Sequence, residues 1–118
     1  MKQPTQAMPH IHTVRKERAW IYCRVANPDA VALKAQQEAL AAYAEKEMFE
    51  IAGTTIEQRN GLSLVRDGIA EISRAAERKQ MDILLVANIC RLGRNAFEVR
   101  EYVRWLKEHG VRVVCLTG

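Results

Sequence analysis

The feature that most constrains the fold is an uninterrupted apolar run, Ile83-Leu84-Leu85-Val86-Ala87, with no polar residue between the hydrophobic ones. A strand with one face in water alternates polar and apolar side chains, so this run indicates a strand that is covered on both faces. Such strands are typical of parallel sheets, because the crossover helices lie over both faces of the sheet. The run therefore predicts an α/β protein with a buried strand at about Asp82–Ile89.

The rest of the chain supplies the alternation of strands and helices that a parallel sheet needs. Apolar or β-branched runs predict three further strands, and apolar residues at helical spacing predict three helices between the strands. The expected order is strand Ala19–Val25, helix Ala30–Glu47, strand Phe49–Thr55, helix Leu62–Lys79, strand Asp82–Ile89, helix Asn95–Glu108 and strand Val111–Leu116. With right-handed crossovers, this order predicts an open, mainly parallel sheet with helices on both faces.

Length and composition are those of one ordinary globular domain. The 118 residues are 48% hydrophobic and 27% charged, which allows one modest core. No apolar run approaches the roughly 18 residues of a membrane helix, and the N-terminus lacks the apolar core of a signal peptide. We therefore expect a cytoplasmic protein that does not associate with a membrane. The cysteines Cys23, Cys90 and Cys115 each lie in an apolar run and are expected to be reduced core thiols.

The excess positive charge is concentrated at the N-terminus. The net charge is +4, and residues 1–18 hold four basic residues against one acidic residue. We expect residues 1–18 to form a basic, mobile arm ahead of a domain at 19–118. Such an arm suits an anionic partner such as nucleic acid, and it is equally compatible with a solvated tail. His10 and His12 have the spacing of half a metal site, but no second pair lies near them, so no metal is expected.

Arginines follow two of the predicted strands at the point where each strand ends. Arg24 lies at the end of the first strand, and Arg91 and Arg94 follow the third. If the chain reverses direction between these strands, their carboxyl ends flank the crevice where open α/β sheets bind ligands. Guanidinium groups suit phosphate, although each arginine could instead pair with a surface carboxylate. Because no glycine-rich turn follows the first strand, a phosphodiester is favoured over a mononucleotide.

Four motifs, in order and at matching spacing, resemble those of the serine recombinases, the resolvase and invertase family. Tyr22-Cys23-Arg24-Val25-Ala26 is similar to Y-x-R-V-S, Leu33-Lys34-Ala35-Gln36 to L-x-x-Q, Arg59-Asn60-Gly61-Leu62 to R-x-G-L, and Cys90-Arg91-Leu92-Gly93-Arg94 to D-R-L-x-R. The resemblance covers about residues 19–118 and implies a resolvase-like catalytic domain.

The resemblance implies a function and a set of site residues. Family members cut DNA with a serine that becomes linked to phosphate, and they exchange strands in a tetramer without a cofactor. The arginines that bind phosphate correspond to Arg24, Arg59, Arg91 and Arg94, and a supporting glutamine corresponds to Gln36. Because a long helix and a DNA-binding domain follow in the family, the resemblance also implies a chain truncated at its C-terminal end. It implies DNA as partner, and a homodimer or higher oligomer in the full-length context.

Two of these site positions depart from the family pattern. Ala26 stands where the family has its nucleophilic serine, and Cys90 stands where it has an aspartate. Since a methyl group cannot form the covalent intermediate, the sequence predicts a recombinase-type domain that does not cleave DNA as written. Two alternatives stay open: an active recombinase that uses another nucleophile, and a non-catalytic dimerisation or regulatory module derived from a recombinase.

Overall fold

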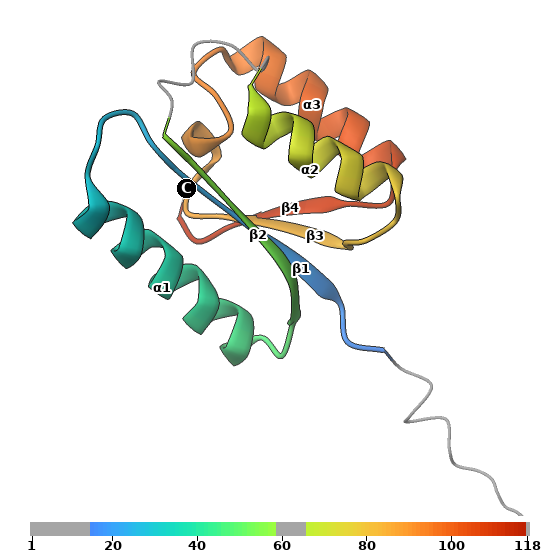
Figure 1. The fold of residues 1–118 in the computed structure, drawn as a ribbon. Helices are drawn as coiled ribbons and strands as arrows, with labels where there is room; N and C mark the ends of the chain where they lie inside the picture. The colour runs from blue at the N-terminus through green and yellow to red at the C-terminus, as the bar shows by residue number, and fades with distance from the viewer. Residues whose placement is uncertain (1–14, 59–65, 118) are drawn as a thin grey trace, which may run out of the picture.

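The computed structural model describes residues 15–58 and 66–117, and shows a four-stranded, all-parallel sheet between two layers of helices (Figure 1). The elements are β1 (Arg18–Val25), α1 (Ala30–Lys46), β2 (Glu50–Gln58), α2 (Asp67–Glu77), β3 (Ile83–Val86), the short 3₁₀ helix η2 (Ile89–Arg91), α3 (Ala96–Glu108) and β4 (Arg112–Cys115). The predicted α/β class and parallel sheet are confirmed.

The strand order β2-β1-β3-β4 places β1 and β3 at the centre of the sheet. β2 therefore lies on one side of β1 and β3 on the other, so the winding of the strands reverses at β1, which is the condition under which the ends of β1 and β3 flank a shared crevice. All four residues of β3 are buried, in agreement with its unbroken apolar run. This strand is shorter than predicted, because the chain leaves the sheet at Ala87 and forms η2 from Ile89.

Successive side chains of β1 face opposite layers of helices. Ala19, Ile21 and Cys23 pack in one core cluster with α1, while Tyr22 packs in a second cluster with α2 and α3. Figure 1 shows the same arrangement, with α1 on one side of the sheet and the other two helices on the opposite side. Because β1 is packed on both faces, its carboxyl end, where Arg24 lies, is held in a fixed position.

Local signals in the sequence set the helix ends. The Asp29 side chain accepts a hydrogen bond from the Ala32 amide at 2.9 Å, and the Asn95 side chain accepts one from the Glu98 amide at 3.1 Å. These bonds satisfy amides in the first turns of α1 and α3 that have no partner within the helix. After α3, Gly110 has a φ of 81°, a conformation that favours glycine.

Two further element boundaries differ from the sequence prediction by several residues. β2 runs to Gln58 instead of Thr55, because it stays paired with β1 up to Val25. α2 begins at Asp67, whereas the sequence predicted a start at Leu62. In the described part of the chain, no helix is long and apolar enough to cross a membrane.

Candidate functional site

The carboxyl ends of β1 and β3 meet at one edge of the sheet, which we call the carboxyl edge. Ala26 follows the last residue of β1 directly, and its side chain is exposed. The chain then turns through residues 27–29 into α1. Position 26 therefore presents its side chain to solvent at the edge where open α/β sheets bind ligands, and that side chain is a methyl group.

Arg24 connects β1 to η2. Its side chain is buried, and its Nε and Nη2 atoms each donate a 2.7 Å hydrogen bond, to the carbonyl oxygens of Arg91 and Cys90 respectively. Burial lowers the pKa of Arg24, and the positive charges of Arg66 and Arg91 add to this effect. The guanidinium of Arg24 therefore positions η2 against the end of β1.

Gln36 fastens the same end of β1 to α1. Its side-chain oxygen accepts a hydrogen bond from the Arg24 amide at 3.0 Å, and its side-chain nitrogen donates one to the Arg24 carbonyl at 3.2 Å. Both polar groups of the Arg24 backbone thus contact one side chain. The predicted supporting glutamine lies beside the predicted arginine, where it holds the backbone two residues before Ala26.

Arg91 and Arg94 bring further positive charge to the carboxyl edge. Arg91 Nη1 donates to the Arg24 carbonyl at 3.1 Å, while the buried Nε atom of Arg91 has no hydrogen-bond partner among the described residues. The Arg94 side chain is exposed. Within the described ranges, neither arginine forms an ion pair with a carboxylate. Neither guanidinium is therefore neutralised by a carboxylate of the described chain.

The structure corrects the prediction for one cysteine. Cys23 is buried, as expected, and burial raises the pKa of its thiol to about 11. Cys115 is half-buried, but Cys90 is exposed, so it is not a core thiol. Cys90 follows the predicted end of the third strand at Ile89, and in the structure Ile89–Arg91 forms η2 at the carboxyl edge.

A buried network behind this edge was not predicted from the sequence. Glu57 accepts a 2.6 Å hydrogen bond from the Tyr22 hydroxyl and pairs with Arg66 at 3.1 Å. Arg66 also donates to the Tyr22 hydroxyl at 3.1 Å and to the Leu92 carbonyl at 2.7 Å. The second oxygen of Glu57 accepts a 2.9 Å hydrogen bond from the Gly68 amide, at the start of α2. The network therefore joins β1, β2, α2 and the loop after η2.

The environment of Glu57 keeps it ionised. Burial alone would raise its pKa, but hydrogen bonds from Tyr22 and the Gly68 amide, together with the charge of Arg66, hold the pKa below its usual value. Burial and the hydrogen bond to Glu57 raise the pKa of Tyr22, so its hydroxyl stays a donor. A Cβ at Gly68 would lie 2.5 Å from Glu57 Oε1, so only glycine fits there without a shift.

A sequence signal for Arg66 was present. The pattern R-x-G followed by an apolar residue occurs twice, at Arg59-Asn60-Gly61-Leu62 and again at Arg66-Asp67-Gly68-Ile69. By resemblance to the family, the first copy was expected to lie directly before the second helix. In the structure the second copy lies there, since α2 begins at Asp67. The predicted site residue Arg59 lies outside the described residues.

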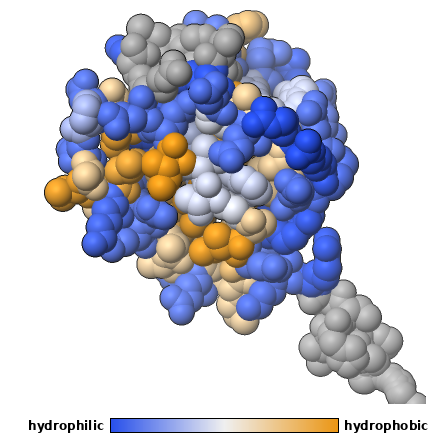
Figure 2. Space-filling view, viewed as in Figure 1, coloured by the Kyte–Doolittle hydropathy of each residue, from blue (hydrophilic) through white to orange (hydrophobic). Residues whose placement is uncertain are grey.

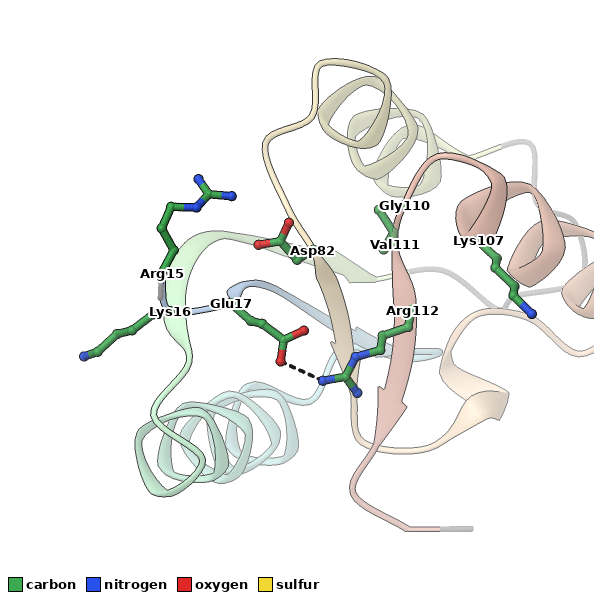
Figure 3. Close-up of a pocket in the computed structure, with 8 residues that line it drawn as sticks. All are labelled: Arg15, Lys16, Glu17, Asp82, Lys107, Gly110, Val111 and Arg112. Atoms are coloured by element: carbon green, nitrogen blue, oxygen red, sulfur yellow. Dashed lines mark hydrogen bonds and ion pairs between the residues drawn. The ribbon is translucent and has the colours of Figure 1, made fainter. Parts of the chain in front are cut away.

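A pocket lies at the opposite, amino end of the sheet (Figure 3). Its volume is about 440 Å³, and its lining includes charged residues of both signs. Arg112 pairs with Glu17 at 2.8 Å, and Arg18 pairs with Asp82 at 3.2 Å. Figure 3 shows the Lys107 side chain extending away from the pocket. In this pocket Glu17 compensates Arg112, while Arg15 and Lys16 form no ion pair among the described residues.

The family model "Resolvase, N terminal domain" matches residues 19–118, which is most of the chain. The chain belongs to the resolvase family. The resemblance inferred from the motifs is thereby confirmed, and the fold is that of the family's catalytic domain.

Solved structures agree with this assignment. The resolvase-type domain is similar to the C-terminal catalytic domain of ISC1926 TnpA, an IS607-like serine recombinase, with 26% identity, a TM-score of 0.80, and coverage of 86% of this chain and 68% of that one. The N-terminal catalytic domain of TP901-1 integrase has 22% identity and a TM-score of 0.77, over 85% and 77% of the two chains. A resolvase family site-specific recombinase from Streptococcus pneumoniae has 22% identity and a TM-score of 0.74, over 85% and 72%. The last two show the fold alone.

No group of three or more metal-ligating side chains occurs in the part of the chain that the structure describes. Among the described residues, the carboxyl edge presents guanidinium groups, the exposed thiol of Cys90 and the methyl group of Ala26. This set can bind an anion, and position 26 lacks a hydroxyl that could attack one.

Proposed function

We propose that the chain is a resolvase/invertase-type recombinase domain that binds the DNA backbone at its carboxyl edge and does not cleave it. The observation that carries the proposal is Ala26, exposed at the end of β1 next to the position where Arg24 fastens η2. In a serine recombinase this position supplies the attacking hydroxyl, and an alanine cannot form the phosphoserine link.

The arginines support the phosphate half of this proposal. Arg91 is partly exposed, Arg94 is exposed, and neither forms an ion pair within the described residues. Guanidinium groups aimed at a phosphate stabilise the charge that develops in phosphoryl transfer. Arg24 acts differently in the proposed site, since two of its donors bind carbonyl oxygens of η2 and thereby position Arg91.

The same arrangement explains why binding and cleavage separate. Attack on a phosphodiester needs a nucleophile within about 3.5 Å of the phosphorus and in line with the leaving oxygen. The β1–α1 turn delivers residue 26 to the carboxyl edge, so replacing its side chain removes the reaction without disturbing the buried contacts of Arg24 and Gln36. An electrostatic site without a nucleophile still holds an anion.

A covalent-trapping assay on supercoiled DNA tests the proposal. The protein as written is expected to form no protein–DNA adduct, because Ala26 has no reactive atom. An adduct with the unmodified chain would show that another nucleophile acts, and the proposal would be wrong. The double variant Ala26→Ser, Cys90→Asp restores the serine and the aspartate of the family pattern. An adduct with this variant would show that the arginines still support cleavage of a phosphodiester. Ala26→Gly with Cys90→Asp is the matched control and is expected to form none.

The second candidate function is a non-catalytic dimerisation or regulatory module derived from a recombinase. The exposed apolar residues Ile51 and Ile56 on the edge strand β2 favour this role, because they suit contact with another protein. The two functions separate in one comparison. A chain that self-associates but binds no duplex DNA at low salt would support the module, whereas DNA binding that depends on Arg94 supports the recombinase-type function.

A further inference from the structure

Two buried arginines bind the backbone of η2 and of the loop that follows it. Arg24 Nη2 and Nε each donate a 2.7 Å hydrogen bond, to the carbonyls of Cys90 and Arg91 respectively. Arg66 Nη2 donates at 2.7 Å to the next carbonyl along the chain, that of Leu92. Guanidinium groups therefore hold three consecutive carbonyl oxygens. Because hydrogen bonds from a charged donor are stronger than those between neutral groups, this segment is fixed more firmly than an ordinary turn.

Arg66 differs from the charged residues of α2, the helix that it precedes. Those residues are exposed, and Figure 2 shows hydrophilic side chains over this helix; they are Asp67, Glu71, Arg74 and Glu77. The Arg66 side chain is only 3% exposed. Burying a guanidinium group is costly unless it is paired and hydrogen-bonded, so its position depends on the contacts that it makes inside the molecule.

One of these contacts reaches outside the sheet. Arg66 Nε donates to Glu57 Oε1, and Nη2 donates to both the Tyr22 hydroxyl and the Leu92 carbonyl. Tyr22 and Glu57 belong to β1 and β2, which already pair with each other along their length. Leu92 belongs to the loop between η2 and α3. The contact with Leu92 therefore fastens this loop to the centre of the molecule.

Arg94 lies between two fixed points of the same loop. Two residues before it, the Leu92 carbonyl is bound by Arg66 and the Leu92 side chain is fully buried. One residue after it, the Asn95 side chain caps α3 by accepting a hydrogen bond from the Glu98 amide at 3.1 Å. The exposed side chain of Arg94 therefore starts from a backbone position that both of its neighbours define.

We infer that Arg66 is a positioning residue for phosphate binding: by holding the Leu92 carbonyl, it fixes the direction in which Arg94 meets a phosphate of the DNA backbone. The inference rests on the proposed function and extends it to a buried residue that acts through Leu92 instead of through contact with DNA. A charge that is already in place binds an anion more tightly than a mobile one, because less of the chain has to be ordered on binding.

The double variant Glu57→Gln, Arg66→Met separates positioning from charge. It removes one negative and one positive charge together, so the net charge is unchanged and neither partner is left as an uncompensated buried charge. The matched control is Asp82→Asn, Arg18→Met, which removes the partly buried ion pair at the amino end of the sheet with the same change in charge. Arg94 is present in both variants. Circular dichroism and thermal melting check that both stay folded.

Hydrogen exchange measures whether Arg66 fixes the loop. The amides of Arg91 and Leu92 donate to the carbonyls of Asn88 and Ile89 at 3.1 Å each, so their exchange reports the order of η2 and of the start of the loop. In the Arg66 double variant these amides are expected to exchange about tenfold faster or more, while the amides of β3 keep their protection. The control is expected to leave both sets unchanged. Unchanged protection of the two amides in the Arg66 double variant would overturn the inference.

Fluorescence anisotropy of a labelled DNA duplex measures the consequence for binding. The Arg66 double variant is expected to bind about tenfold more weakly and to lose about one from the slope of log K against log salt concentration, as is expected for loss of the Arg94 contact, while the control keeps both values. Binding as tight as that of the wild type, by a variant whose loop has lost protection, would overturn the inference alone. A wild type that binds no duplex at low salt would instead overturn the proposed function, and the inference with it.

Arg66→Lys replaces the double variant if the latter does not fold. Lysine keeps the positive charge beside Glu57, but it lacks the planar fork that donates from Nε and Nη2 at once. It is expected to shift both measurements in the same direction, with faster exchange of the Arg91 and Leu92 amides and weaker binding of the duplex. Wild-type values for both would overturn the inference.

Discussion

At the scale of single residues, the ion pair of Glu57 and Arg66 is the contact on which the stability of the fold depends most. Both side chains are at least nine-tenths buried, and the pair joins β2 to the start of α2. Removing one partner of a buried ion pair leaves the other charge uncompensated, which costs about 3–5 kcal/mol. We therefore expect Glu57→Ala to lower the free energy of unfolding by about 3 kcal/mol or more, measured by urea denaturation. Glu38→Ala, at an exposed position of α1, is the control and is expected to change it by less than about 0.5 kcal/mol.

The lowered pKa of Glu57 predicts how stability depends on pH. Its folded pKa lies below the unfolded value of about 4.3, so ionised Glu57 stabilises the fold above that value. The contribution is lost as the pH falls through the folded pKa. The difference in unfolding free energy between the wild type and Glu57→Gln is therefore expected to be constant above about pH 5 and to shrink below about pH 4. A difference that grows on acidification would contradict the assignment of an ionised Glu57.

The residues of the candidate site were predictable to different degrees. Arg24, Gln36, Arg91 and Arg94 follow predicted strands or lie on a predicted helix, and the structure brings the first three into hydrogen-bond contact. Local sequence does not reveal that Arg24 is buried and bound to carbonyl oxygens, because burial depends on η2, which lies 66 residues further along. Arg66, directly before α2, was missed because the first of the two R-x-G patterns was placed at the start of the second helix, and its contact with Glu57 on β2 is not visible in the local sequence.

At the scale of elements, periodicity predicted the strands and helices, and it failed at their ends. Ile89 was predicted to be the last residue of the third strand, but it lies outside the sheet and begins η2. A short apolar run has no period that separates a strand from a tight turn. β2 shows the converse, because Glu57 and Gln58 are poor strand formers by composition and are held in the strand by pairing with β1.

The N-terminal cap of α1 sets where the chain turns after Ala26. Asp29 satisfies the amide of Ala32, and α1 in turn carries Gln36 to the end of β1. Replacing a capping aspartate with alanine costs about 1 kcal/mol. Asp29→Ala is expected to lower the thermal midpoint accordingly, measured by calorimetry. Asp29→Ser retains a capping oxygen and is expected to recover most of the loss, whereas equal losses in both variants would contradict the capping role.

At the scale of the whole molecule, the two ends of the sheet differ in how their charges are compensated. At the amino end, Arg18 and Arg112 each pair with a carboxylate. At the carboxyl edge, Arg91 and Arg94 form no ion pair within the described residues. An anion bound at Arg91 and Arg94 therefore does not compete with a carboxylate of the described chain.

This difference predicts the salt dependence of DNA binding. Each phosphate contact contributes about 0.9 to the slope of log K against log salt concentration, so Arg94→Ala is expected to reduce that slope by about one. The measurement is fluorescence anisotropy of a labelled duplex over a range of salt concentrations. Arg104→Ala is the matched control, because it removes the same charge from an exposed α3 residue that pairs with Glu101. If both variants change the slope equally, the duplex responds to net charge alone, and Arg94 does not contact a phosphate.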